Sequence, residues 1–356
     1  MKRVLLAMSG GVDSSVAAYI LKREGFNVIG ATIKTWSSDE CRDERSKGCC
    51  SIQDIDDARS VAGKLNIPHY VMDLSSDFKE KVIDYFINSY LDGKTPNPCI
   101  ACNKYIKFGI FLKKAEELEA EYIATGHYAR RMWDKDKGRW TVQVAKDQTK
   151  DQSYVLFSLT QYQLSKTLLP VGEYTKSEIR DMAHQLGLRN FDKPDSQEIC
   201  FVSKHYGDFI QKNRSDLPGK GKIVDQKGNI LGDHDGYYLY TIGQRKRIGS
   251  IHSTPYFVTS INKESNEVVV GDEKSLYKKT MEIQKMNWTI EPRLKQSYEV
   301  KIRSRIHRSR GELLQFTKES AIFEFELPEK AISPGQAAVI YDGPNVIGGG
   351  WIEKSY

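Results

Sequence analysis

Ser9-Gly10-Gly11-Val12-Asp13-Ser14-Ser15 joins a short apolar stretch at residues 3–8 to an amphipathic stretch at residues 14–24. The pattern on either side predicts a strand before this loop and a helix after it. Two adjacent glycines let a backbone turn tightly and approach an anion closely, and the serines add hydroxyl donors. The helix start contributes backbone N–H groups and the positive end of its dipole. The stretch therefore predicts a strand–loop–helix unit that binds phosphate.

Strand-like and helix-like segments alternate through the first 130 residues. Besides the two segments above, the apolar patterns predict strands at residues 27–33, 69–74 and 121–125, and helices at residues 54–65, 78–91 and 105–118. This order is typical of a doubly wound parallel sheet. Ligands of such sheets bind at the carboxyl ends of the strands, which is where the phosphate-binding loop would lie.

The rest of the chain follows two other patterns. Residues 160–188 are helical in pattern with a break at 168–172, which indicates a small helical middle region. Later, Gly, Asn and Asp turns separate short β-rich runs at residues 222–224, 237–240, 256–261, 267–270, 298–302, 321–326 and 337–341. Their spacing favours one or two small barrels. We expect the α/β fold class, with the parallel sheet and the helical region in residues 1–205, a small β-rich domain at 206–275 and a barrel-like domain at 276–356.

The charge of the chain is informative only locally. With 53 Lys and Arg against 47 Asp and Glu, the formal net charge of +6 does not by itself indicate a nucleic-acid ligand. Residues 301–310, in contrast, contain five Lys or Arg side chains and no acidic one. Strand alternation would place Lys301, Arg303 and Arg305 on one face, where they would suit phosphates.

Cysteines are too sparse for a disulfide scaffold, with six in 356 residues: Cys41, Cys49, Cys50, Cys99, Cys102 and Cys200. The N-terminal apolar stretch is too short for a secretory signal, and no apolar run approaches the roughly 20 residues of a membrane-spanning helix. We therefore expect a cytoplasmic protein without a membrane partner, whose cysteines serve catalysis or metal binding. Cys49 and Cys50 follow a loop at residues 38–47 that we interpret as a flexible flap, and they are more typical of packing at a helix start.

Cys99 and Cys102 have the CxxC spacing and follow Thr95-Pro96-Asn97-Pro98. The two prolines stiffen the chain and fix where the cysteines point. Lys104 and Lys107 lie close by in sequence and would favour a thiolate. We expect this pair to precede a helix N-terminus and to have a chemical role. Cys200, taken alone, is equally consistent with a core residue and with a functional thiol.

The loop at residues 9–15 resembles the PP-loop of the N-type ATP pyrophosphatases, which include amidating synthetases and tRNA-thiolating enzymes. Further stretches resemble the tRNA-specific 2-thiouridylase family, and the matches extend from residue 9 to residue 343. They are SGGVDSS, CCSIQDIDDAR, TPNPCIACNKYIKFG, YIATGHYAR, KDQSYVLFSL, DSQEICFV, GQRKRIG and SPGQAAVIYDG. The TPNP…CNK and ATGHYAR segments are specific to this family.

The resemblance implies an ATP-dependent tRNA-uridine 2-sulfurtransferase that acts on the wobble uridine. The C2 oxygen of uracil is a poor leaving group, and transfer of AMP to it makes a good one. A cysteine persulfide can then place sulfur on the carbon as AMP leaves. By resemblance, Cys200 carries the persulfide and Cys102 is the paired nucleophile, through ordinary thiol exchange and a transient or resting disulfide.

The resemblance also implies ligand contacts residue by residue. The ATP contacts are Ala7, Met8, Ser9, Gly10, Gly11, Val12, Asp13, Ser14, Ile33 and Gly126. ATP implies Mg²⁺ on its phosphates, with Asp13 a candidate to lie near it. The tRNA contacts are Asn97, Pro98, Cys99, His127, Lys150, Asp151, Gln152, Arg303, Ser304 and Gln336. The helical part at about 155–205 and the C-terminal barrel are also expected to touch tRNA.

Two positions depart from the family pattern. Some relatives have Asp where this chain has Cys99, and several have Tyr where it has Ser304. Cys99 opens a second hypothesis, in which Cys99, Cys102 and Cys200 ligate a 4Fe-4S cluster. The competing reading is a persulfide enzyme without a cluster, in which Cys99 is a spare or resolving thiol. Zinc is a weaker option because a fourth ligand is not evident.

The partners implied are the tRNAs for Lys, Glu and Gln, and a cysteine desulfurase or sulfur-relay protein as sulfur donor. Two other functions stay open at this point. An amidating PP-loop synthetase would need an ammonia source and no paired cysteines. A nucleic-acid-binding module with a vestigial nucleotide site would not release AMP in response to tRNA.

Overall fold

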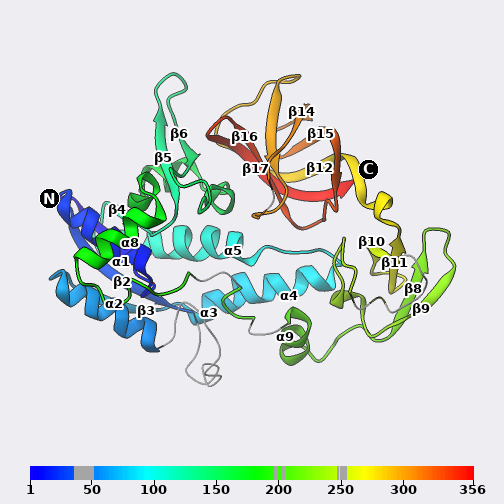
Figure 1. Cartoon of the computed structure of the whole chain (residues 1–356), viewed down its shortest axis with the longest axis horizontal. Helices are drawn as coiled ribbons and strands as arrows, with labels where there is room; N and C mark the ends of the chain where they lie inside the picture. Colours follow the sequence, from blue (N-terminus) through cyan, green and yellow to red (C-terminus); the bar gives the residue numbers. More distant parts are fainter. Residues whose placement is uncertain (36–51, 196–198, 203–204, 247, 249–254, 306) are drawn as a thin grey trace. The chain divides into compact units, whose positions relative to one another are not determined.

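The computed structural model describes residues 1–35, 52–195, 199–202, 205–246, 248, 255–305 and 307–356 (Figure 1). Cys41, Cys49, Cys50 and the expected flap at 38–47 lie outside the described residues. The chain forms two compact units. The first unit contains Met1–Ile83, Pro98–Ser203 and Pro344–Ile347, and the second contains Asp84–Asn97, Lys204–Gly343 and Gly348–Tyr356.

A five-stranded parallel sheet forms the centre of the first unit (Figure 1). Its order is β3 (His69–Asp73), β2 (Asn27–Lys34), β1 (Arg3–Ala7), β4 (Tyr122–Ala124) and β7 (Thr167–Leu168). From β1 the chain proceeds outward to β2 and β3, and then returns to place β4 on the other side of β1. The strand order therefore reverses between β1 and β4, and the predicted doubly wound sheet is confirmed.

Helix α1 (Val12–Arg23) packs on this sheet because its apolar residues recur at helical spacing. Val12, Val16, Ala17 and Ile20 are all at most 2% exposed. Helices α2 (Ile52–Lys64) and α8 (Lys176–Gln185) pack against α1. The helical middle region also contains η3 (Ser153–Leu156), α7 (Gln161–Ser165) and η4 (Pro170–Glu173). It agrees with the prediction for residues 160–188.

The helix predicted at residues 105–118 begins earlier, at Pro98. It consists of α5 (Pro98–Ala101), the π-helical segment η2 (Cys102–Ile110) and α6 (Phe111–Glu117). Proline suits the first helical position, because its φ is already helical and its missing N–H has no partner there in any case. The expectation that Cys99 and Cys102 precede the helix was therefore wrong, and both lie within its first turns.

The helix predicted at residues 78–91 is divided in a similar way. It consists of α3 (Ser75–Phe78), the π-helical η1 (Lys79–Ile83) and α4 (Asp84–Leu91), and α4 belongs to the second unit. A hairpin of β5 (Ala129–Asp134) and β6 (Arg139–Val144) was not predicted. Charged residues at both ends of β5 hide its alternation. In the first unit, Val346 pairs with Val142 of β6.

The second unit contains a four-stranded sheet and a closed barrel. The sheet has the order β10 (Phe257–Asn262), β11 (Glu267–Gly271), β8 (Gly221–Asp225) and β9 (Ile230–His234). The barrel strands are β12 (Tyr277–Trp288), β15 (Ser320–Lys330), β14 (Ser309–Phe316), β13 (Ser297–Lys301), β16 (Ala337–Asp342) and β17 (Asn345–Ser355). Pairing of β12 with β17 closes the barrel. The β-rich, barrel-like C-terminal region is thus confirmed. Helix α9 (Tyr206–Asn213) and the short η6 (Glu273–Leu276) complete this unit.

Two local predictions in the second unit were wrong. Residues 237–240 do not form a strand, although Tyr237 and Tyr238 are both buried. They form a 3-10 turn, η5 (Tyr237–Leu239). β13 ends at Lys301, so Arg303 and Arg305 lie in the turn that follows rather than on one strand face with Lys301.

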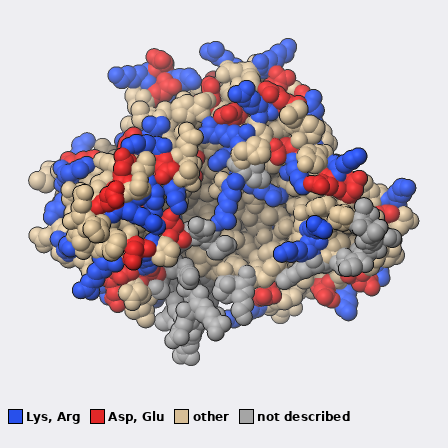
Figure 2. Space-filling view, in the orientation of Figure 1, with Lys and Arg blue, Asp and Glu red and all other residues tan. Residues whose placement is uncertain are grey.

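None of the helices in the described part of the chain is long and apolar enough to cross a membrane. Basic and acidic side chains are interspersed over the face shown in Figure 2. This distribution agrees with the small net charge of the whole chain.

Candidate functional site

Gly10 is required by the shape of the predicted phosphate loop. Its φ is +71°, a left-handed conformation that favours glycine. A Cβ atom at Gly10 would lie 2.3 Å from the carbonyl oxygen of Asp54, in α2. Gly126, which follows β4 by two residues, is equally confined, since its Cβ would lie 2.8 Å from the backbone nitrogen of Ser14. The absence of side chains at both positions lets three chain segments converge around the loop.

The loop lies where the strand order of the sheet reverses. β1 leads into Ser9–Gly11 and its neighbour β4 leads into Gly126, so both carboxyl ends open at the same point. Open α/β sheets bind ligands in the crevice at such a point. Helix α1 starts at Val12, and Gly11 supplies no side-chain cap. The first N–H groups of the helix therefore suit an anionic ligand.

Ion pairs join this loop to residues far along the chain. The Nζ atom of Lys176 lies 2.7 and 2.9 Å from the two carboxylate oxygens of Asp13 and 2.6 Å from Asp195. The Tyr128 hydroxyl donates to Asp13 over 2.7 Å. Burial, together with the Asp13 carboxylate, raises the pKa of Tyr128, so the phenol keeps its proton and remains a donor. The side chain of Lys176 is only 9% exposed, and a buried ammonium needs such anionic partners.

The segment that precedes Cys200 is bonded to the same loop. Asn190 donates from Nδ2 to the carbonyl of Gly10 over 2.9 Å and to the Ser15 hydroxyl over 3.0 Å. The Nζ atom of Lys193 lies 2.7 Å from Asp54 and 2.6 Å from Asp57. Asp195 pairs with Lys176, which also binds Asp13, so residues 190–195 are bonded to the loop directly through Asn190 and indirectly through Lys176. Sequence patterns gave no sign of Lys176 or Asn190 as site residues, because each acts through contacts with distant segments.

The predicted catalytic thiols Cys102 and Cys200 belong to the first unit, as does Cys99. Cys99 is exposed, and Cys102 and Cys200 are half-buried. Cys99 and Cys102 are three residues apart on one helix, so they share a face. Phe201 packs edge-to-face on Phe78 with ring centroids 5.9 Å apart, which anchors the chain next to Cys200. Residues 196–198 lie outside the described part.

Side chains that could bind a metal are scattered over the described part of the chain. In the described residues, no three His, Cys, Asp or Glu side chains come together as a metal site. Cys99, Cys102 and Cys200 therefore do not come together as the ligands of one cluster in this structure. Both carboxylate oxygens of Asp13 are engaged by Lys176, so a contact between Asp13 and Mg²⁺ stays a prediction.

The other predicted ATP contacts lie around the loop. Ala7 ends β1, and the amide of Met8 donates to the carbonyl of Ala31 in β2 over 2.8 Å. Ile33 lies near the end of β2. The Ser9 amide donates to the Ser14 hydroxyl over 3.2 Å, which closes the turn. The loop is thus hydrogen-bonded within itself and, through Met8, to β2.

The predicted tRNA contacts of the first unit make many internal bonds. The Gln152 side chain accepts from the Tyr128 amide over 2.9 Å, and Asp151 accepts from the Ala145 amide over 3.1 Å. Lys150 pairs with Asp195 over 2.8 Å. These side chains hold the turn at residues 145–153 in place, so direct contact of each with tRNA remains a prediction.

His127 is buried, with its Nδ1 atom 2.8 Å from the hydroxyl of Thr125. Burial holds the pKa of His127 well below its usual range, and the charge of Lys107 acts in the same direction. The imidazole is therefore neutral at physiological pH. A tRNA contact by His127 would require this ring to act as a neutral hydrogen-bonding group.

Acid is expected to destabilise the wild-type protein more than it destabilises the His127→Gln variant. The unfolded His127 takes up a proton as the pH falls below about 6.5, whereas the folded one does not. The unfolded state then binds more protons, so the free energy of unfolding decreases as the pH falls, by up to about 1.4 kcal/mol per pH unit. Chemical denaturation at about pH 7.5 and about pH 5.5 measures this difference. Equal pH dependence in both proteins would contradict the neutral, buried state of His127.

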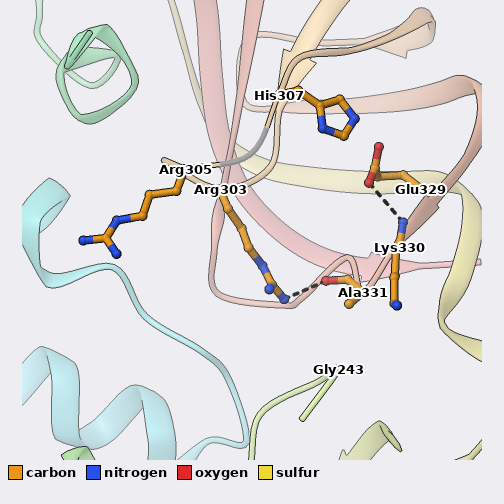
Figure 3. A pocket seen from close by; sticks show the side chains of 7 residues that line it. All are labelled: Gly243, Arg303, Arg305, His307, Glu329, Lys330 and Ala331. Atoms are coloured by element: carbon orange, nitrogen blue, oxygen red, sulfur yellow. Dashed lines mark hydrogen bonds between the residues drawn. The ribbon is translucent and has the colours of Figure 1, made fainter. Parts of the chain in front are cut away.

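A cavity of about 420 Å³ opens in the second unit (Figure 3). Its lining residues are Gly243, Arg303, Arg305, His307, Glu329, Lys330 and Ala331. Arg303 donates to the Ala331 carbonyl over 2.9 Å and to the Ser333 hydroxyl over 2.8 Å. Figure 3 shows Arg305 directed away from Ala331. Three cations against one carboxylate give this cavity a positive balance, which suits a phosphate-bearing ligand.

Comparison with known proteins covers almost the whole chain. Family models match in three segments: a tRNA methyl transferase HUP domain at residues 2–204, a tRNA methyl transferase PRC-barrel domain at 207–272 and an aminomethyltransferase beta-barrel domain at 278–352. The tRNA-specific 2-thiouridylase MnmA of Clostridioides difficile is 47% identical over 359 residues, covering 99% of each chain. The chain belongs to the tRNA-specific 2-thiouridylase family. The 2-thiouridylase MnmA of Moorella thermoacetica is also 47% identical, over 98% of this chain and 99% of its own.

Membership of the 2-thiouridylase family agrees with the resemblance seen in the sequence. Solved structures are more remote. A 4-thiouridine synthetase–RNA complex with bound ATP is 17% identical, with a TM-score of 0.35, over 59% of this chain and 50% of its own. The family assignment therefore rests on the full-length relatives and the family models.

Proposed function

We propose that this protein catalyses ATP-dependent 2-thiolation of the wobble uridine of tRNA. One observation carries the proposal: the segment leading to Cys200 is bonded to the Gly10 carbonyl through Asn190 and Lys193, and Asp195 pairs with Lys176, which also binds Asp13 of the loop. Activation by ATP and sulfur transfer are thereby linked within one unit of the chain. Full-length similarity to 2-thiouridylases supports the same activity.

The first half of the reaction activates the base. The C2 oxygen of uridine attacks the α-phosphorus of ATP, the bond to the β-phosphate oxygen breaks, and pyrophosphate leaves. The N–H groups at the start of α1 bind the phosphates, which is the ordinary use of a helix start after a glycine-rich loop. Mg²⁺ would arrive on those phosphates and neutralise part of their charge. Lys176 balances the charge of Asp13 beside them.

The second half transfers sulfur. The terminal sulfur of a Cys200 persulfide attacks C2, the bond from C2 to the AMP oxygen breaks, and AMP leaves. The Cys102 thiolate then attacks the Cys200 sulfur, which breaks the S–S bond to the product and releases 2-thiouridine. A Cys102–Cys200 disulfide forms, and an external thiol supplies the two electrons that reduce it. A new persulfide comes from a cysteine desulfurase or a sulfur-relay protein.

Each unit has its proposed part in binding tRNA. The residues at 97–99 and His127 approach the target base, and the barrel side chains Arg303, Ser304 and Gln336 contact the tRNA body. The reacting uridine leaves its stack to reach ATP and the thiols, as bases do in other base-modifying enzymes. We propose that the substrates are the tRNAs for Lys, Glu and Gln, and that the protein acts in the cytoplasm. We also propose that the domain boundaries lie at residues 205 and 275.

A 4Fe-4S enzyme and an amidating synthetase are the alternatives. The cluster reading predicts iron and sulfide in anaerobically purified protein and loss of activity when they are removed. Iron-free protein with full activity would exclude it. An amidating synthetase would release AMP with ammonia and without tRNA. The descriptions of the family models name methyl transfer. That reaction would require neither a pair of thiols nor a phosphate-binding loop.

The experiment that tests the function measures AMP and nucleosides together. Purified protein is incubated with tRNA, ATP and a sulfur source, and 2-thiouridine is quantified by mass spectrometry. We expect one AMP for each 2-thiouridine and no AMP without tRNA. AMP release that requires ammonia would contradict the proposal. AMP release that is the same with and without tRNA would also contradict it.

Arg305→Ala is expected to weaken tRNA binding at all salt concentrations. Arg305 lines the positive cavity and lies on an exposed turn. The association constant for tRNA falls as the salt concentration rises. Removing one phosphate contact makes the slope of its logarithm against the logarithm of the salt concentration less steep by roughly 0.7–0.9. The matched control is Arg310→Ala, because Arg310 is an exposed arginine of β14 that does not line the cavity. Filter binding over a salt series measures both slopes, and an equal change in the two variants would contradict a specific role of the cavity.

A further inference from the structure

Asn103 is a buried polar side chain in the helix that carries the thiols. It directly follows Cys102, which is the first residue of the π-helical segment η2, and it is only 2% exposed. Its Nδ2 atom donates to the carbonyl of Val155, in η3, over 3.2 Å. Asn103 and Val155 both belong to the first unit. One side-chain hydrogen bond thus joins the start of η2, beside Cys102, to η3.

Within the described part of the chain, the side-chain amide of Asn103 is satisfied at its nitrogen but not at its oxygen. The Oδ1 atom is buried and accepts no hydrogen bond from any described residue. A buried acceptor without a donor destabilises a protein, whereas an apolar side chain of similar shape would not. A native group of this kind calls for an explanation other than stability. The explanation for Asn103 is to be sought in what its nitrogen holds.

The geometry of η2 is of the kind that depends on outside contacts. A π-helix is rare, and single π-helical turns occur frequently at functional sites. Side-chain hydrogen bonds hold η2 near both of its ends: Asn103 reaches out to Val155 at the start, and Gln163 of α7 donates from Nε2 to the carbonyl of Phe108 over 2.7 Å. The direction of the Cys102 side chain therefore depends on the contact at the start.

The segment to which Asn103 is bonded is itself bonded to the phosphate loop. The amide of Val155 donates to the carbonyl of Gln152 over 3.2 Å, and the amide of Gln152 donates to the carbonyl of Tyr128 over 2.7 Å. The Tyr128 hydroxyl in turn donates to Asp13 over 2.7 Å. A continuous series of hydrogen bonds within the first unit therefore runs from Asn103, next to Cys102, to the phosphate loop.

We propose that Asn103 is a positioning residue, which anchors the start of η2 on η3 and thereby fixes Cys102 relative to the phosphate loop. The residue acts through Cys102 and takes no chemical step itself. An asparagine with an unsatisfied oxygen fits this role, because functional sites accept a local cost in stability in return for a fixed geometry. The proposal rests on the function above, since it gives Cys102 a catalytic thiolate.

The test compares two thiols of one helix in the absence of tRNA and ATP. The rates at which iodoacetamide alkylates Cys102 and Cys99 are measured by peptide mass spectrometry over a pH series, with the exposed Cys99 as internal reference. In Asn103→Leu the bond to Val155 is lost and the half-buried Cys102 is released. We expect the ratio of the Cys102 rate to the Cys99 rate to rise by about fivefold, which corresponds to about 1 kcal/mol.

Stability and a second variant separate positioning from folding. The urea midpoint of Asn103→Leu should stay close to that of the wild type, because the unsatisfied oxygen is removed together with the hydrogen bond. Asn103→Asp keeps the shape of the side chain and removes the donor, so it should raise the ratio of rates in the same way. A ratio that is unchanged at every pH in both Asn103 variants would overturn the proposal.

Gln163→Met is the matched control, because it removes the amide-to-carbonyl hydrogen bond at the far end of η2. Gln163 also belongs to the capping box of α7, so this variant should lower the urea midpoint. It should nevertheless leave the ratio of the two alkylation rates unchanged. An equal change of this ratio in Gln163→Met and Asn103→Leu would overturn the proposal. Because alkylation is read without turnover, the result does not depend on whether the protein makes 2-thiouridine, and the two proposals can fail separately.

Discussion

Cys200→Ala is expected to reduce 2-thiouridine formation by about 10³-fold or more, because it removes the sulfur-bearing nucleophile. Pyrophosphate release should persist, since the phosphate loop is unchanged and adenylation precedes sulfur transfer. Cys102→Ala is expected to stop turnover after the persulfide has attacked, which leaves the tRNA joined to Cys200 by a disulfide. Mass spectrometry of tRNA nucleosides and of the intact protein measures both outcomes. Normal 2-thiouridine formation by Cys200→Ala would refute the assignment.

Cys99→Ala is the matched control for these two variants. Cys99 lies on the same helix face as Cys102 and is the exposed member of the pair. In the persulfide mechanism it has no obligatory chemical step, so most of the activity should remain. In the cluster mechanism it is an iron ligand, and its loss should remove iron and activity together. The Cys99 variant therefore separates the two chemistries that the sequence leaves open.

Gly10→Ala is expected to abolish AMP formation through loss of ATP binding. The new Cβ atom would lie 2.3 Å from the Asp54 carbonyl, and φ is +71°, so the loop must open to accommodate it. Opening of the loop displaces its N–H donors, and losing one hydrogen bond to a charged phosphate costs about 1.5–3 kcal/mol, which corresponds to roughly 10- to 150-fold in affinity. ATP affinity by calorimetry and tRNA-dependent AMP release measure the effect.

Gly25→Ala is the matched control for Gly10→Ala. Gly25 follows α1 with a φ of +84°, but a Cβ atom there would meet nothing within 4 Å. Both substitutions therefore place alanine at a positive φ, but only the one at Gly10 brings the new Cβ atom against the backbone of Asp54. We expect Gly25→Ala to lower stability by about 1 kcal/mol and to leave ATP affinity unchanged. Equal loss of ATP affinity in the two variants would contradict the role given to the loop shape.

The parts that could be predicted from sequence are local. The apolar stretch, the glycine pair and the amphipathic stretch around Gly10 are consecutive, so periodicity and turn chemistry suffice to predict strand, loop and helix. The β-rich region was also predictable as a class, because turn residues separate short runs. The start of the thiol-bearing helix was predicted too late, because Pro96 and Pro98 were interpreted as a stiff stretch ahead of the helix, although Pro98 is the first helical residue.

The parts that could not be predicted depend on contacts between distant residues. Lys176 reaches Asp13 across 163 positions, and Asn190 reaches Gly10 across 180. A lone lysine on a polar helix gives no local signal of such a partner. Arg303 similarly looked like part of a strand face, whereas it lies in a turn and bonds to the Ala331 carbonyl. Gln336 was assigned to tRNA by resemblance, and no sequence pattern indicated that its side chain also donates to the carbonyls of Thr95 and Pro96.

The most direct test of the central claim follows labelled sulfur through a single turnover. Protein loaded with a ³⁵S persulfide on Cys200 is mixed with unmodified tRNA and ATP, and the tRNA is digested to nucleosides. We predict that the label appears in 2-thiouridine at the wobble position, with one AMP released for each labelled nucleoside. Label that stays on the protein while AMP is released, or label that reaches tRNA from Cys200→Ala, would contradict sulfur transfer by a Cys200 persulfide.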